Sequence, residues 1–110
     1  MLKISFQDFQ KIDLRVGTII SVDDFPEANK PAYKLVIDFG PLGIKKSSAQ
    51  ITKLYKKNDL LNKQIIANIN FNDKQIANFK SQCLVIGTAM DNSVVILSPA
   101  EEVPNGSVVQ

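Results

Sequence analysis

The sequence contains no histidine and only one cysteine among its 110 residues. Without histidine there is no imidazole for a catalytic triad, a zinc site or general-base chemistry. Cys83 has no second cysteine for a disulfide, and its apolar neighbours favour a buried, unreactive thiol over a nucleophile. The five glycines are scattered, so there is no glycine-rich phosphate loop. These absences argue against an enzyme and favour a binding module that needs no metal or cofactor.

Long apolar runs are also absent. No run approaches the roughly 18 to 20 residues that a membrane span requires, and the first ten residues lack the apolar core of a signal peptide. We therefore expect a cytoplasmic protein without membrane insertion. The hydrophobic content of 45% and charged content of 22% are typical of globular proteins. A chain of 110 residues has the size of one domain, which we expect to span residues 1–110.

Positive charge is concentrated in the middle of the chain. Residues 30–80 carry ten lysines against three aspartates, whereas residues 1–29 and 81–110 have net charges of −2 and −3. A basic segment between acidic ends is typical of a polyanion-binding face if folding gathers the lysines. The alternative is a solvated lysine-rich surface. Lysine suits phosphates, whereas reading of base edges favours arginine, and Arg15 is the only arginine. Any nucleic acid should therefore be recognised by its backbone and shape.

The hydrophobic pattern indicates short strands. Alternation predicts strands over residues 14–22, 33–39, 44–51, 65–71, 83–89 and 94–97. Gly17 inside the first strand predicts a bulge or sharp bend, as needed where one strand serves both halves of a small barrel. Short helices are expected over 5–9, capped by Ser5, and over 52–58, with a helical turn at 75–79. The tail from Ser98 should be mostly extended.

These elements predict an all-β fold with short helices. A five-stranded Greek-key OB-fold barrel with N- and C-terminal extensions is the leading candidate, because that fold places a helix between its third and fourth strands. An SH3-like barrel is the alternative from the pattern alone. The predicted strand over 44–51 is apolar on neither face, so burial specifies it weakly. We infer that one of its faces serves another purpose.

Four stretches of the chain together resemble a known family. They are IDLRVGTI (12–19), FPEANKPAYKLVIDFGPLGIKKSSAQIT (25–52), NFNDKQIANFKSQCLVIG with the following TAM (70–90), and VILSPAEEVPNG (95–106). They resemble the tRNA-binding domain family, and within it the CsaA branch of small export-related chaperones. The resemblance implies an OB-fold homodimer, completed by its terminal segments, that binds tRNA or other structured RNA. Unfolded or pre-export polypeptides, or export factors, are the alternative partners.

The resemblance also indicates candidate contact residues, most of them in the basic segment. Together with neighbouring lysines, the candidate RNA-binding residues are Lys30, Lys34, Lys45, Lys46, Ser47, Ser48, Asn70, Lys74, Lys80 and Ser81. Each has a structural alternative. Lys45 and Lys46 would protect an exposed strand from pairing, Ser47 and Ser48 would satisfy buried backbone groups, and Asn70 would be a turn residue.

The chain departs from the family pattern after the fourth predicted strand. Asn72-Asp73 stands where the family tends to have a proline-containing stretch, and residues 81–84 replace the Ser-Glu-x-Met of structure-specific tRNA binders. Both changes weaken the case for transferring the family's RNA-binding residues to this part of the chain. Most aromatic residues fall at inward positions, so structured RNA is a better ligand than single strands stacked on aromatics.

Two other functions compete with RNA binding. In a peptide-binding chaperone, outward apolar residues such as Ile19, Val36 and Ile66 would line an exposed or interfacial groove. In a structural appendage, the dimer surface would dock on a synthetase or an export factor.

Overall fold

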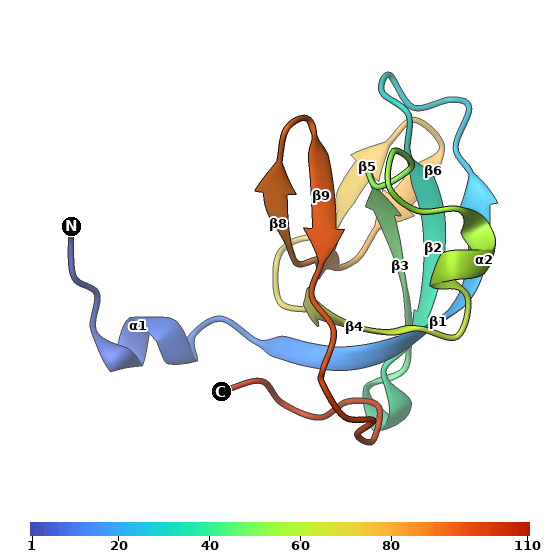
Figure 1. Cartoon of the computed structure of the whole chain (residues 1–110). Helices are drawn as coiled ribbons and strands as arrows, with labels where there is room; N and C mark the ends of the chain where they lie inside the picture. Colours follow the sequence, from blue (N-terminus) through green and yellow to red (C-terminus); the bar gives the residue numbers. More distant parts are fainter.

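A five-stranded antiparallel sheet curls into a barrel in the computed structural model, which describes residues 1–110 (Figure 1). The sheet order is β3-β2-β1-β4-β7. Its strands are β1 (Leu14–Asp24), β2 (Tyr33–Asp38), β3 (Ile44–Ala49), β4 (Gln64–Asn68) and β7 (Leu84–Val85). A 3-10 turn, η1 (Gly40–Leu42), joins β2 to β3, and the helix α2 (Lys57–Leu60) lies between β3 and β4. This arrangement is an OB-fold and confirms the predicted fold class.

Two hairpins are added to the barrel. The first pairs β5 (Lys74–Ile76) with β6 (Phe79–Ser81), and the second pairs β8 (Gly87–Met90) with β9 (Ser93–Ile96). The predicted helical turn at 75–79 is therefore wrong. Ile76 and Phe79, whose three-residue spacing suggested a helix, are cross-strand partners, and left-handed Ala77 (φ 51°) makes the turn between them. The predicted strand over 83–89 is divided at Ile86. Its N–H still bonds to Ile66 of β4, but its carbonyl accepts the N–H of Leu97, and the strand after it pairs with β9 instead of β4.

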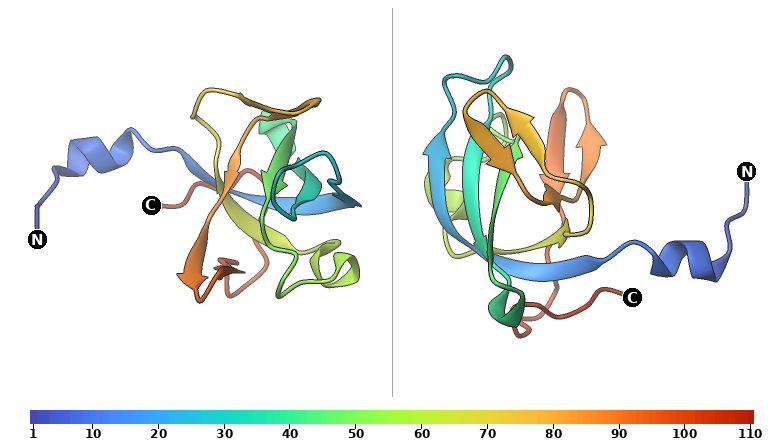
Figure 2. Two further views of the ribbon diagram at one scale, coloured as in Figure 1. Left: turned by 90° about the horizontal axis from the view of Figure 1, so that it is seen from above. Right: turned by 180° about the vertical axis from the view of Figure 1, so that it is seen from behind.

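The helices are short, and α1 lies away from the barrel. As predicted, Ser5 caps α1 (Phe6–Gln10) by accepting a hydrogen bond of 3.0 Å from the N–H of Asp8. No residue of α1 is buried, and the helix projects from the barrel (Figure 2). The second helix begins later than the predicted 52–58, because the carboxylate of Asp59 accepts the N–H of Lys56 at 2.8 Å. Neither helix has the length or the apolar character to span a membrane.

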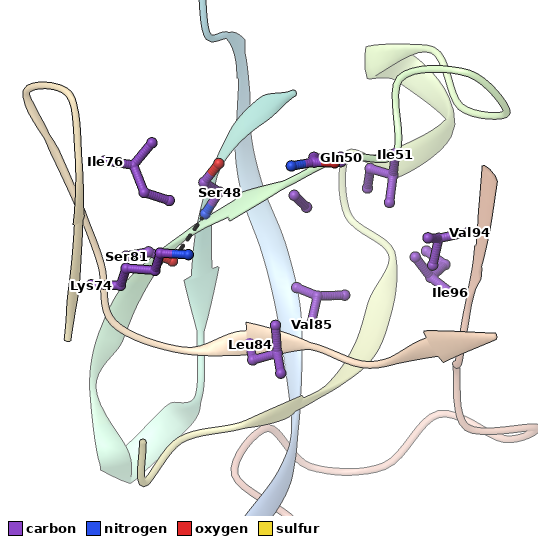
Figure 3. A pocket seen from close by; sticks show the side chains of 11 residues that line it. Ser48, Gln50, Ile51, Lys74, Ile76, Ser81, Leu84, Val85, Val94 and Ile96 are labelled. Carbon is purple, nitrogen blue, oxygen red and sulfur yellow. Dashed lines mark hydrogen bonds between the residues drawn. The ribbon is translucent and has the colours of Figure 1, made fainter. Parts of the chain in front are cut away.

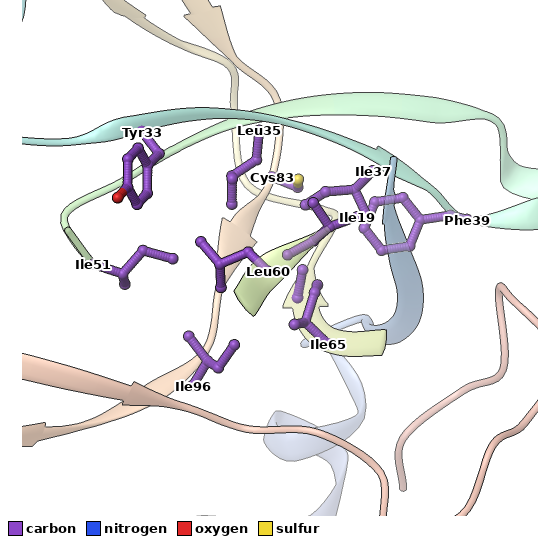
Figure 4. Packing of buried hydrophobic residues seen from close by; sticks show 11 residues of the cluster. Ile19, Tyr33, Leu35, Ile37, Phe39, Ile51, Leu60, Ile65, Cys83 and Ile96 are labelled. Carbon is purple, nitrogen blue, oxygen red and sulfur yellow. The ribbon is translucent and has the colours of Figure 1, made fainter. Parts of the chain in front are cut away.

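The core is formed by the inward faces of β1, β2 and β4, with Leu60 of α2 and Ile96 of β9 packed against them (Figure 4). Ile19, Leu35, Ile37 and Phe39 are completely buried. A Cβ on Gly17 would lie 2.7 Å from Ile37 and 2.8 Å from the Phe39 ring, so only glycine lets β1 pass so closely. The bulge predicted at Gly17 lies instead between Ile19 and Ser21. Ile19 lies before this bulge and faces the core together with Gly17, contrary to its expected outward position.

β4 follows its predicted alternation until it ends. Ile65 and Ala67 are buried, as expected, but Asn68 is also buried at 1% exposure and Phe71 is 58% exposed. The side-chain oxygen of Asn68 accepts the N–H groups of Asn70 (3.2 Å) and Phe71 (3.1 Å). This turn redirects the chain: Ile69 still packs against the core, as predicted, whereas Phe71 lies at the surface.

The barrel closes between β3 and residues 81–83 without a regular strand ladder. The backbone of Lys46 donates to the side chain of Gln82 (3.0 Å) and accepts the N–H of Gln82 (2.7 Å). The Ser47 hydroxyl donates to the carbonyl of Cys83 (3.0 Å), and the N–H of Ser48 donates to the Ser81 hydroxyl (3.2 Å). We call this contact the seam. Side chains here take the place of backbone groups in closing the barrel.

Cys83 lies at the inner side of the seam and is 7% exposed. Burial raises the pKa of its thiol from 9.0 to about 11, although the Ser47 hydroxyl and the charge of Lys45 act in the opposite direction. The thiol therefore stays protonated at neutral pH, in agreement with the expected unreactive cysteine.

Replacing Cys83 with alanine tests this burial through the pH dependence of stability. A raised pKa means that the thiol's contribution is fully present below pH 9.0 and is lost as the pH rises toward 11. We expect the free energy of unfolding of the wild type to fall by about 2–3 kcal/mol relative to Cys83→Ala across this window. Urea denaturation of both proteins over a pH series measures this difference. Parallel profiles would contradict a buried thiol.

Candidate nucleic-acid interface

Only the inward side chains of β2 and β3 pack in the core. The side chains on the outer face of these strands are mostly polar. Lys34 lies opposite Ser48, and Val36 lies opposite Lys46, on this outer face. Lys45 follows the opposite alternation, is half-buried, and lies close enough to Cys83 for its charge to act on the thiol. The two adjacent lysines of β3 therefore have different surroundings, and only Lys46 belongs to the outer face.

An aromatic pair holds two loops together beside this outer face. Phe25, after β1, and Phe79, in β6, pack edge to face with ring centroids 5.4 Å apart, and both are at least 90% buried. The ammonium of Lys34 lies 5.6 Å from the Phe25 ring centre, and that of Lys46 lies 5.3 Å from the Phe79 ring centre. These cation–π contacts restrict both lysines. In OB-folds, the loops joined here flank the face that binds oligonucleotides.

Three more lysines lie on the two segments that this pair joins. Lys30 is exposed on the loop over 25–32, and Lys74 and Lys80 are exposed on the β5–β6 hairpin. We call the group the lysine face; it consists of Lys30, Lys34, Lys46, Lys74 and Lys80.

No member of the lysine face forms an ion pair. The ion pairs of the protein lie elsewhere: Lys11–Asp8, Arg15–Asp13 and Lys57–Asp24. In the last of these, the hydrogen bond that the ammonium of Lys57 donates to the carboxylate of Asp24 raises the pKa of Lys57. Asp23 is the β1 partner of Lys34 in the sheet register, and Asp73 precedes Lys74, yet neither acid pairs with a lysine. The charge of the lysine face therefore stays available to an anion.

Two adjoining cavities lie next to the lysine face. One, of about 330 Å³, opens in the seam and is lined by apolar side chains of β7 and β9 (Figure 3). The other, of about 440 Å³, lies between the loop over 25–32, Gln50 and the β5–β6 hairpin. Ser48, Gln50, Lys74 and Ile76 line both. The side chain of Lys74 extends toward Ser48 and Ser81 in Figure 3.

Several sequence-predicted contact residues have structural partners. Ser47 is completely buried in the seam, so its side chain cannot reach a ligand while β3 is in place. The Asn70 amide accepts the N–H of Asp13 (3.0 Å) and donates to the carbonyl of Lys11 (2.6 Å), which ties β4 to the segment before β1. The Ser81 hydroxyl holds the N–H of Ser48. Lys45 lies off the outer face, so the lysine face and Ser48 remain together.

The apolar groove expected from Ile19, Val36 and Ile66 is not formed. Ile19 is in the core, and the other two residues are half-buried. Exposed apolar residues occur elsewhere, among them Phe6 (71%) near the N-terminus and Phe71 (58%) near the seam. The sequence pattern also missed Gln50, whose only signal was its place at the end of the polar strand KKSSAQ.

Residues 14–108 match the family described as the putative tRNA binding domain. The chain belongs to the tRNA-binding domain family. It is 34% identical to the methionine–tRNA ligase of Thermococcus onnurineus over 97% of this chain, and 36% identical to that of Pyrococcus horikoshii over the same share. The chain spans only 14% of the length of these two ligases. The family confirms the resemblance seen in the sequence.

Solved structures of similar length superpose on the whole chain. The chaperone CsaA of Bacillus anthracis has a TM-score of 0.95 and 47% identity, covering 99% of this chain and 100% of that one. The CsaA chaperone protein of Picrophilus torridus has a TM-score of 0.92 and 53% identity, covering 98% and 100%. This tRNA-binding domain is thus similar both to CsaA proteins and to a segment of methionine–tRNA ligases.

Proposed function

We propose that this protein binds structured RNA, tRNA above all, through the lysine face. The observation that carries the proposal is the gathering of five lysines without ion pairs beside the ligand-binding loops of an OB-fold. Membership of the tRNA-binding domain family supports it. The function needs no catalytic group and belongs in the cytoplasm.

The contacts we propose are to phosphates. Ammonium groups neutralise phosphates without reading bases, so affinity comes from counterion release and depends steeply on salt. The Phe25–Phe79 pair is too buried to stack on bases, so the lysine face itself recognises RNA by shape and charge. Its role is to hold Lys34 and Lys46 in place, which lowers the conformational entropy lost on binding.

Reversing two charges of the lysine face tests this proposal. We expect Lys46→Glu combined with Lys74→Glu to weaken tRNA binding strongly and to reduce the slope of log affinity against log salt by about 1.5 to 2. Fluorescence anisotropy with nucleic-acid-free protein, between about 50 and 200 mM salt, measures both. Lys3→Glu with Lys63→Glu is the matched control, since it changes the net charge equally outside the lysine face. An equal loss in both proteins would contradict the assignment.

We also propose that the protein is a homodimer. Helix α1 buries none of its residues, and Phe6 is 71% exposed. The C-terminal segment lies beside β1, where Arg15 bridges to Val108, and Val108 is 53% exposed. Apolar surface on both terminal segments would be covered by a second copy.

Light scattering tests the dimer directly. We expect a mass near twice 12.2 kDa at micromolar concentration, and a lower mass for Phe6→Ser, because Phe6 contributes to the proposed interface and not to the barrel core. Leu54→Ser is the control, since Leu54 is also exposed (44%) but lies before α2. A wild-type mass near 12.2 kDa would overturn the proposal.

A chaperone that binds unfolded polypeptides is the second candidate function. It is favoured by the similarity to two solved CsaA chaperones and by the exposed apolar residues Phe71 and Leu84. We expect RNA-free protein to slow the aggregation of an unfolded client, measured by light scattering, and to do so at high salt, because salt does not screen apolar contacts. Phe71→Ser with Leu84→Ser should lose this effect, whereas the Lys46/Lys74 variant should keep it. No suppression at any molar ratio would exclude this function.

A further inference from the structure

The polar cavity of about 440 Å³ is lined by three carboxamide side chains. Asn29 comes from the loop over 25–32, Gln50 follows β3, and Gln75 comes from β5. Lys30 and Lys74, both members of the lysine face, also line it. The cavity therefore brings amide groups and positive charges together from three separate segments.

These amides keep most of their hydrogen-bonding capacity free. The side chains of Asn29 and Gln50 bond to no other group of the protein, and neither do the backbone N–H and C=O of Gln50. Gln75 donates to the carbonyl of Ala77 at 3.0 Å and leaves its side-chain oxygen free. A carboxamide presents a donor and an acceptor side by side, which is the arrangement on the edge of a nucleic-acid base.

The remaining walls suit the flat face of a base. Ala28, Ala32 and Ile76 supply apolar surface in the cavity. Behind them, Phe25 and Phe79 join the loop to the hairpin, with ring centroids 5.4 Å apart. The volume is within the range of sites that bind small ligands. The two walls of the cavity are thus held together before any ligand arrives.

We propose that this cavity receives the base of one unpaired nucleotide in an otherwise structured RNA. Lys30 and Lys74 hold the flanking phosphates, and Asn29 and Gln50 bond to the base edge. The nucleotide must be unpaired, because pairing occupies the edge that the amides would read. The inference rests on the proposed RNA binding and adds to it a contact with a base, which the lysine face does not provide.

A pair of RNA hairpins with equal numbers of phosphates tests the proposal. Each stem is closed by a linker without bases. One kind of hairpin carries a single bulged nucleotide, with each of the four bases in turn, and the other is abasic at that position. We expect the wild type to bind at least one base-bearing hairpin about tenfold more tightly than the abasic one. In Asn29→Ala with Gln50→Ala, this preference should disappear while the salt slope stays unchanged, because phosphate contacts and base contacts are separate.

The control variant is Asn58→Ala, which removes an exposed carboxamide from α2 and should keep the preference. Asn29 and Gln50 are exposed, so their replacement leaves the core intact. Equal binding of base-bearing and abasic hairpins by the wild type, with a steep salt slope, would overturn this inference and leave the proposed RNA binding standing. Absence of salt-dependent binding to either hairpin would overturn both.

Discussion

The closure of the barrel depends on satisfying the free edge of β3. β3 has one regular neighbour, β2, so the backbone groups on its other edge need partners or water. Lys46 is matched by both the backbone and the side chain of Gln82, and Ser47 reaches the carbonyl of Cys83. These side chains close the barrel where the strands no longer pair. Beyond Ser48 no partner follows, and the two cavities begin there.

The same connection places the candidate RNA surface. Residues 81–83 begin with the last residue of β6, so closing the seam brings the β5–β6 hairpin against β3 and the loop over 25–32. Phe79 then packs on Phe25, and their rings hold Lys46 and Lys34. The apolar packing of two loops thus positions charges that would otherwise spread apart. Because these side chains are already restricted, little conformational entropy is lost when a polyanion binds to this face.

The sequence predicted the barrel strands well and their side-chain directions less well. Alternation in β2 places Leu35 and Ile37 in the core, as expected. In β1 the bulge after Ile19 reverses the alternation, and no residue type marks its position. The spacing of Ile76 and Phe79 fits a helix or a two-residue hairpin equally, and only the left-handed backbone of Ala77 decides between them. Local patterns do not contain that information.

For the binding face, the sequence by itself determined the excess of lysine in residues 30–80, the lack of histidine, and the family. Only the tertiary structure decided which polar residues reach the surface. Lys45 and Lys46 are neighbours in the chain but belong to opposite faces of β3. Ser47 is buried in the seam, where its hydroxyl donates to the carbonyl of Cys83. Gln50 lines the cavity because no hydrogen-bonding partner within the protein reaches the backbone where β3 has ended. The reason is that charge and composition add along the chain, whereas exposure depends on contacts between segments far apart in it.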